Sequence, residues 1–198
     1  MKEEIESIKK YATINNVPIM QDSGINYLTN YIKKHNIKHI LEIGTAIGYS
    51  AIMMCLVNDD IVVTTIERDE KRYLEAIKNV KKFKLEDRIN LIYKDALEVN
   101  LNEKYDLIFI DAAKAQNTNF FERFERNLCD GGTIITDNMN FHGLVFKDES
   151  EIENISPKDR TYYFMMTETK LNAYVMRVYP ITSMVGNAAV YTILTLIL

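Results

Sequence analysis

The chain has 198 residues, of which 47% are hydrophobic and 26% are charged, and its formal net charge is −4. These values are typical of one globular domain with a sizeable core, and they exclude a general electrostatic attraction to nucleic acid, although a local basic patch could still bind RNA. The N-terminus lacks an apolar signal segment, the longest apolar run is too short to span a bilayer, and two distant cysteines, Cys55 and Cys129, fit buried thiols in a reducing cytosol.

The spacing of apolar residues predicts alternating helices and strands. Ile5, Ile8 and Tyr11 recur at helical spacing, Pro18 favours an extended linker, and β-branched runs such as 61–66 favour buried strands. In chain order we expect a helix over 1–16, a linker over 17–20, a helix over 22–34, a strand over 37–43, a helix over 49–56, a strand over 61–66, a helix over 69–83, strands over 89–93 and 105–110, a helix over 117–128, a turn over 130–132, and strands over 133–136 and 188–198.

This alternation predicts an α/β fold with a doubly wound, mostly parallel sheet and helices on both faces. We see no repeat, low-complexity segment or linker, so residues 1–198 are expected to form a single domain.

A glycine turn joins the first strand to the third helix. Residues 40–50 read Ile-Leu-Glu-Ile-Gly-Thr-Ala-Ile-Gly-Tyr-Ser, with Gly44 and Gly48 at the junction. A strand, a glycine turn and a helix N-terminus can cradle a charged small molecule. Two glycines at this spacing can equally form only a tight connection.

Four later strands each end in an acidic residue: Glu67, Asp95, Asp111 and Asp137. Ligands of open α/β sheets bind outside the carboxyl ends of the strands, so these carboxylates are expected around one crevice. A helix cap would explain any one of them, but it explains all four less well.

The positions of these carboxylates suggest the ligand. Glu67 lies about 20 residues past the turn, where an acidic residue accepts ribose hydroxyls, and Asp95 could accept an adenine amino group. Glu42, beside the turn, would disfavour a pyrophosphate and tolerate a cation, which favours S-adenosylmethionine over NAD. A nucleotide-dependent oxidoreductase and a non-catalytic adenosine-binding module remain alternatives, although the third glycine and the Tyr-x-x-x-Lys pair common in short-chain dehydrogenases are absent from the sequence.

Asp111, Asp137 and Asn138 offer oxygen ligands only, which suit a hard divalent cation such as Mg²⁺. Lys114, three residues after Asp111, could act as a general base beside that metal. Helix caps and a solvated lysine are the plain alternatives.

The ordered motifs 41–50, 66–68, 110–114 and 136–138 resemble the cation-dependent O-methyltransferase family, which includes catechol and caffeoyl-CoA O-methyltransferases. The resemblance implies a Rossmann-like class I methyltransferase fold with a seven-stranded sheet, with helices of residues 1–36 capping the site, and often a homodimer. It implies that Lys114 and Asp111 are catalytic and that Asp111, Asp137 and Asn138 hold the metal. The implied cofactor site consists of Met20, Glu42, Gly44, Ser50, Glu67, Asp95, Ala96 and Asp111.

Within that family, the segments 17–20, 65–72 and 87–89 are most similar to bacterial tRNA 5-hydroxyuridine methyltransferases, which act at the wobble position. The resemblance therefore implies tRNA as substrate and a cytoplasmic location, with a small catechol-like or hydroxycinnamoyl substrate as the alternative. The similarity thins after Asp148, where the arginine-rich run and the Gly-Asp-Gly strand of the family are missing. Two clusters could contact RNA phosphates: Lys71, Lys78 and Lys82 with Lys81, Lys84 and Arg88, and Lys33, Lys34, Lys38 and His39.

Overall fold

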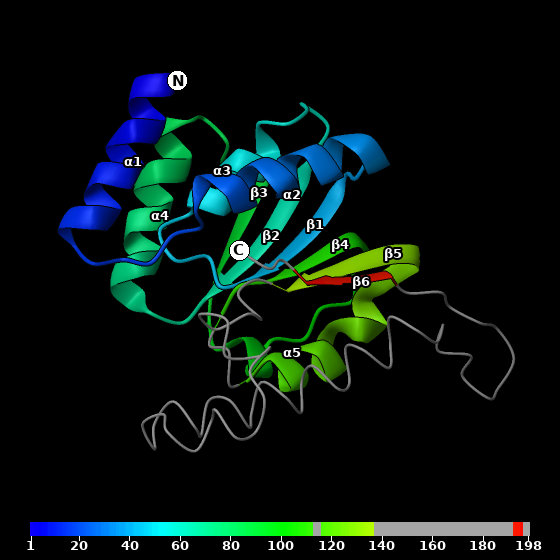
Figure 1. Cartoon of the computed structure of the whole chain (residues 1–198). Coiled ribbons are helices and arrows are strands. Elements are labelled where there is room, and N and C mark those ends of the chain that lie inside the picture. The colour runs from blue at the N-terminus through cyan, green and yellow to red at the C-terminus, as the bar shows by residue number, and fades with distance from the viewer. Residues whose placement is uncertain (113–115, 137–191, 196–198) are drawn as a thin grey trace, which may run out of the picture.

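A computed structural model describes residues 1–112, 116–136 and 192–195 of the chain. Six strands form one parallel sheet in the order β3-β2-β1-β4-β5-β6 (Figure 1). The elements are α1 (Lys2–Ile14), α2 (Asp22–His35), β1 (His39–Ile43), α3 (Tyr49–Cys55), β2 (Val62–Glu67), α4 (Glu70–Lys82), β3 (Ile89–Tyr93), η1 (Ala96–Glu98), β4 (Tyr105–Ile110), α5 (Asn117–Phe124), η3 (Glu125–Asn127), β5 (Leu128–Thr136) and β6 (Thr192–Thr195). The predicted α/β architecture is confirmed, and the described residues include a strand in each of the six ranges predicted to form one. The seventh strand that the resemblance implies stays a prediction.

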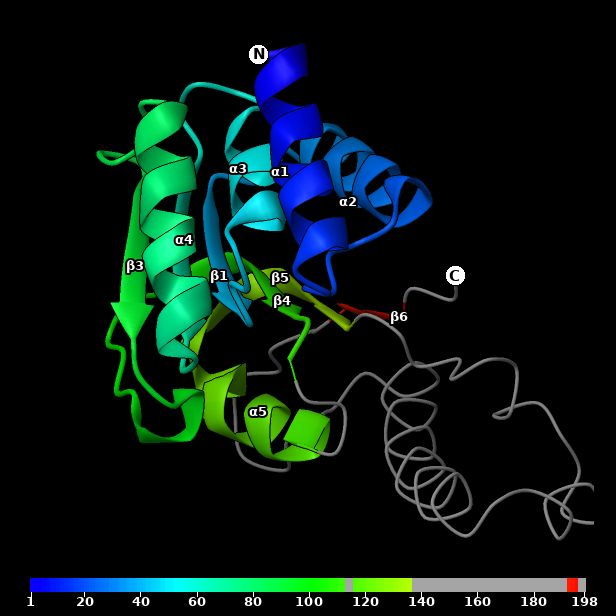
Figure 2. The ribbon, with the colours of Figure 1, turned by 90° about the vertical axis from the view of Figure 1, so that its left-hand side faces the viewer.

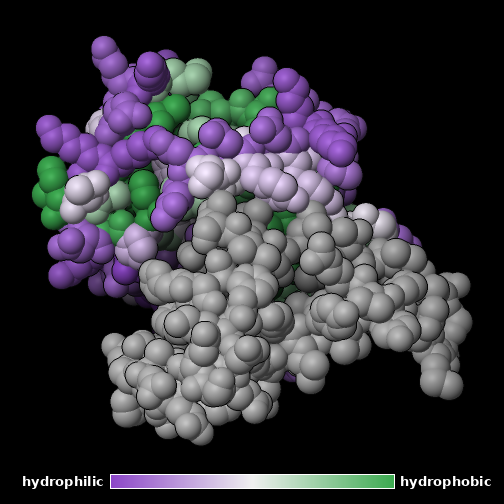
Figure 3. Space-filling model, viewed as in Figure 1, coloured by the Kyte–Doolittle hydropathy of each residue, from purple (hydrophilic) through white to green (hydrophobic). Residues whose placement is uncertain are grey.

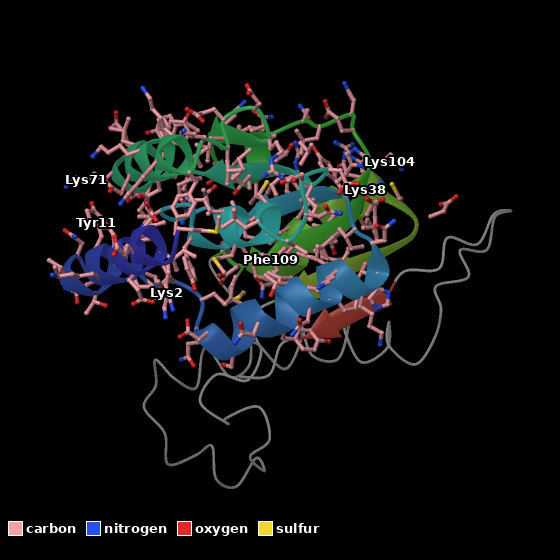
Figure 4. All side chains as sticks on the ribbon, turned by 90° about the horizontal axis from the view of Figure 1, so that it is seen from above. Lys2, Tyr11, Lys38, Lys71, Lys104 and Phe109 are labelled. Atoms are coloured by element: carbon pink, nitrogen blue, oxygen red, sulfur yellow. The ribbon has the colours of Figure 1, made fainter. Side chains whose placement is uncertain are left out.

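The sheet separates two layers of helices. Helices α1 to α4 lie on one face and α5 lies on the other (Figure 2). Alternate strand residues point to opposite faces, so Ile40 and Leu107 join the core with α1 to α4, whereas Leu41 and Ile108 join the core with α5. Figure 4 shows the fully buried Phe109 in the interior, and Lys2, Lys38, Lys71 and Lys104 at the periphery.

The two N-terminal helices pack beside the other helices of their layer. On α1, Ile8 and Ala12 are buried, which confirms the amphipathic helix. An ion pair of 2.5 Å between Lys9 and Asp22 joins α1 to the start of α2. Between these helices, Met20 is only 6% exposed and belongs to the same core as Tyr49 of α3. That these helices cap a bound ligand stays a prediction.

The predicted end of the fifth helix is wrong. Helix α5 ends at Phe124, and β5 already begins at Leu128, before the predicted turn at 130–132. The register of β5 on β4 shifts between the pairs Tyr105–Leu128 and Leu107–Thr133. Between these two pairs, β5 has three more residues than β4, so this part of β5 is irregular. Gly131, within it, has a φ of +76°.

The surface is mostly polar on the side of α1, α2 and α4, with scattered hydrophobic residues between the charged ones (Figure 3). Among the described residues, no helix is long and apolar enough to cross a membrane. Lys71 and Lys38, one from each predicted basic cluster, lie far apart in Figure 4. The clusters approach each other at the start of β2, where Lys38 pairs with Asp60 and Arg88 pairs with the neighbouring Asp59.

Candidate functional site

The candidate site lies at the carboxyl edge of the sheet, where neighbouring parallel strands end together. Backbone hydrogen bonds continue past the strand ends: the Asp111 amide donates to Ile43 at 2.9 Å, and the Gly44 amide donates to Ile66 at 3.0 Å. These bonds join the ends of β4, β1 and β2. The Lys94 amide, next to Asp95, donates to the Glu67 carbonyl oxygen at 3.0 Å and adds the end of β3. The structure thus brings four predicted residues to one edge: Gly44, Glu67, Asp95 and Asp111.

The turn between β1 and α3 requires an unusual backbone. Gly44, Ala46 and Gly48 have φ values of +103°, +47° and +83°. A Cβ atom on Gly44 would lie only 2.3 Å from the carbonyl oxygen of Asp111, so glycine alone fits there. Gly44 therefore permits the close packing of two backbone segments, as the alternative of a tight connection predicts, and the ligand cradle stays a prediction.

Glu42 lies beneath this turn and is completely buried. Its Oε1 accepts a hydrogen bond from Ser50, and its Oε2 accepts one from Thr65, each at 2.5 Å. The Thr65 hydrogen is used in that bond, so the Thr45 hydroxyl donates to the Thr65 oxygen at 2.6 Å. Burial raises the pKa of Glu42 from 4.5 to about 7 and outweighs both hydroxyl bonds, which lower it; the charge of Glu67 raises it further. Glu42 and Ser50 therefore support the turn from the inside.

We expect the Glu42→Gln substitution to flatten the pH dependence of stability. The folded protein keeps a proton on Glu42 that the unfolded chain loses above pH 4.5, because the folded pKa is about 7. The stability from this group is therefore full below the unfolded pKa and falls by about 3 kcal/mol as the pH rises through the folded pKa. Glutamine does not titrate. Free energies of unfolding from urea titrations between about pH 5 and pH 8 measure the difference, and parallel curves for the two proteins would contradict it.

Glu67 ends β2 and points its carboxylate at three backbone amides. Oε2 accepts from Ala46 at 2.8 Å, and Oε1 accepts from Arg68 at 2.9 Å and from Asp69 at 2.8 Å. A carboxylate offers about four acceptor positions, of which the described residues occupy three. The remaining position on Oε2 is compatible with the predicted ribose hydroxyl.

Asp95 follows β3 and caps the short helix η1. Its Oδ1 accepts from the Leu97 amide at 3.0 Å, and its Oδ2 accepts from Arg68 Nη1 at 3.1 Å. The Leu97 amide, and then the Arg68 guanidinium, hold the pKa of Asp95 below its usual value. Asp95 therefore acts only as an acceptor near neutral pH, as the predicted adenine contact requires. The next residue, Ala96, is buried.

Three predicted site residues, Lys114, Asp137 and Asn138, lie outside the described residues. The half-buried Asp111 is the one predicted metal ligand within them. No cluster of three His, Cys, Asp or Glu side chains suited to a metal occurs in the described part of the chain. The oxygen donors of the predicted set fit a hard cation in kind, and the metal assignment stays a prediction.

The structure adds site residues that the sequence pattern did not reveal. Thr45 and Thr65 complete the hydroxyl chain on Glu42, Ala46 donates to Glu67, and Arg68 binds Asp95. Buried Asn79 of α4 donates to the backbone of the turn, at Ile47, with a distance of 2.8 Å. The sequence signal for such residues is weak, although two threonines beside an acidic residue on a buried strand suggest buried hydrogen bonding.

Comparisons with known proteins place the chain among methyltransferases. A sequence model of the O-methyltransferase family matches residues 1–174. A caffeoyl-CoA O-methyltransferase from Populus kitakamiensis is 32% identical over 149 residues, which are 71% of this chain and 63% of that protein. The chain thus spans less than two thirds of the length of this relative.

Solved structures show the same fold. A Staphylococcus aureus protein, provisionally assigned as a caffeoyl-CoA O-methyltransferase, is 37% identical, with a TM-score of 0.77 over 87% of this chain and 82% of its own. An O-methyltransferase from Bacillus cereus, solved in complex with SAH, is 27% identical, with a TM-score of 0.73 over 87% of this chain and 79% of its own. The Rossmann-like class I methyltransferase fold predicted from the sequence is therefore confirmed.

Proposed function

Because the chain belongs to the O-methyltransferase family, we propose that it transfers the methyl group of S-adenosylmethionine to a hydroxyl group. The observation that carries this proposal is the convergence of the glycine turn, Glu67 and Asp95 at one edge of the sheet. Their groups match a small ligand with a ribose and an adenine amino group. The related Bacillus cereus enzyme, solved with SAH, supports the same cofactor.

The turn residues and the acidic residues at the strand ends would contact different parts of the proposed cofactor. Glu67 would accept from the ribose, and Asp95 would accept from the adenine amino group, next to Ala96. Met20 would line the site from the linker between α1 and α2, while Ser50 and the buried Glu42 would act from beneath the turn. Glycine at position 44 lets the turn pack directly against the backbone of Asp111, which holds the two parts of the proposed site together.

The proposed reaction needs a deprotonated hydroxyl close to the sulfonium methyl. Asp111, Asp137 and Asn138 would hold a divalent cation such as Mg²⁺, which, when bound, lowers the pKa of a substrate hydroxyl. Lys114 would accept the hydroxyl proton. A carbon–oxygen bond then forms as the carbon–sulfur bond breaks, and its electron pair stays on the sulfur. The protein's contribution is largely to align the two reactants.

The substrate is proposed to carry two neighbouring oxygens. Caffeoyl-CoA carries a catechol ring, and the named relative from Populus kitakamiensis supports a small phenolic substrate. The 5-hydroxyuridine of tRNA also presents two such oxygens, and it stays the alternative from the sequence resemblance. In the structure, Lys78 pairs with Glu75 at 2.8 Å and Lys82 contacts Ser7 at 3.2 Å, so part of one basic cluster is engaged within the protein. Both lysines are exposed, and the phenolic substrate is favoured here by the named relative alone.

A labelled-methyl assay tests the proposal. The protein is incubated with labelled S-adenosylmethionine and either a simple catechol or tRNA bearing 5-hydroxyuridine, with and without a chelator. We expect chelator-sensitive labelling of the catechol. Faster labelling of the tRNA, reduced by charge reversal of Lys71 and Lys81, would favour the RNA substrate. Labelling of neither, with no binding of S-adenosylmethionine, would contradict the proposed function. A homodimer and a cytoplasmic location stay predictions.

A further inference from the structure

Ala46 has an unusual backbone for a residue with a side chain. Its φ of +47° lies in the left-handed region, which costs free energy for every residue except glycine. Ala46 stands between Gly44 and Gly48 in the turn, so the chain uses alanine where the neighbouring left-handed positions use glycine. Some other contact must stabilise this conformation.

The Ala46 amide is held by the side chain that ends the neighbouring strand. It donates to Glu67 Oε2 at 2.8 Å. Glu67 is itself fixed, because Oε1 accepts from the amides of Arg68 and Asp69, and its side chain is buried. A hydrogen bond that an amide donates to a fixed, buried carboxylate is a strong interaction. Glu67 therefore selects the backbone direction of Ala46.

We propose that Glu67 is a positioning residue for the turn as well as the ribose contact of the proposed function, on which this inference rests. The same oxygen, Oε2, holds the Ala46 amide and has the acceptor position left for the ribose. Ribose recognition and the shape of the turn are then linked. Glu67 holds Ala46, in a turn where Gly48 also donates to Thr45 and Asn79 to Ile47, each at 2.8 Å.

Ligand binding separates this role from a ribose contact. The dissociation constants of S-adenosylhomocysteine and of its 2′,3′-dideoxy form are measured for the wild-type protein, Glu67→Ala, and Glu67→Ala with Ala46→Gly. We expect Glu67→Ala to weaken both ligands at least tenfold. Glycine adopts the left-handed conformation without a stabilising contact. Adding Ala46→Gly to Glu67→Ala should therefore increase the affinity for the dideoxy ligand at least threefold. Wild-type affinity of Glu67→Ala for the dideoxy ligand would overturn the inference.

Amide hydrogen exchange of Ala46 provides a readout that needs no ligand. Exchange should be at least tenfold faster in Glu67→Ala than in the wild-type protein. The matched control is Glu70→Ala, an exposed glutamate at the start of α4, which should leave Ala46 exchange unchanged. Equal exchange in Glu67→Ala and wild type would overturn the inference. If Glu67→Ala does not fold, Glu67→Gln replaces it and should accelerate exchange in the same direction.

The binding and exchange experiments distinguish failure of this inference from failure of the proposed function. If the wild-type protein binds neither ligand, the proposed function fails, while the exchange rate of Ala46 still decides whether Glu67 positions the turn.

Discussion

Replacing Asp111 by asparagine is expected to lower kcat/KM for methyl transfer about a thousandfold, which corresponds to about 4 kcal/mol of transition-state stabilisation. Asp111 directly follows β4, and its backbone meets both Ile43 and Gly44 at the centre of the candidate site. Asparagine keeps the size of the side chain and removes its charge, so a charged ligand for a cation is lost. Initial rates with labelled S-adenosylmethionine measure the effect.

The same strand offers a control at its opposite end. Asp106 Oδ2 accepts from the amides of Lys38 at 3.0 Å and His39 at 2.9 Å, away from the candidate site. Asp106→Asn should change stability but leave kcat/KM within about threefold of wild type. Full activity of Asp111→Asn, or an equal loss in both variants, would contradict the role assigned to Asp111.

Replacing Gly44 by alanine is expected to lower the free energy of unfolding by about 4 kcal/mol or more. The new Cβ would lie 2.3 Å from the Asp111 carbonyl oxygen, and φ at this position is +103°. Neither the contact nor the backbone angle can relax without moving β4 away from the turn. Urea denaturation followed by circular dichroism measures the loss.

Gly131 is the matched control for this substitution. It also has a positive φ, of +76°, but a Cβ there would meet no atom within 4 Å. Gly131→Ala should therefore lower the free energy of unfolding by about 1 kcal/mol, the cost of the left-handed backbone conformation alone. Similar losses in the two variants would show that the backbone angle, and not the approach to Asp111, makes Gly44 necessary.

Most of the fold could be predicted from the sequence because local patterns and global structure agree. The β-branched segment 61–66 became β2, and the alternation of helices and strands gave a parallel sheet. The end of α5 could not be predicted in the same way. Leu128 is buried whether the segment is a helix or a strand, so its apolar character could not show where β5 begins.

The candidate site was predicted less completely. Residues at strand ends, such as Glu67, could be placed because parallel strands end at one edge. The contact between Glu42 and Thr65 depends on the register of β1 and β2, in which these two residues are partners. Sequence spacing does not reveal that register. The left-handed Ala46 was missed for a similar reason, because alanine gives no local signal for it.

The order of strands also has a consequence for how the protein folds. Strand β1 is central: Ile40 pairs with Val63 of β2 and with Leu107 of β4. The chain segment between Ile40 and Val63 is much shorter than the one between Ile40 and Leu107, so pairing β1 with β2 costs less loop-closure entropy than pairing β1 with β4. We therefore expect β1, β2 and β3 to associate before β4 docks on the other side of β1. Glu67 belongs to the early half and Asp111 to the late one, so the capacity to bind a ligand would arise only in the last stage of folding.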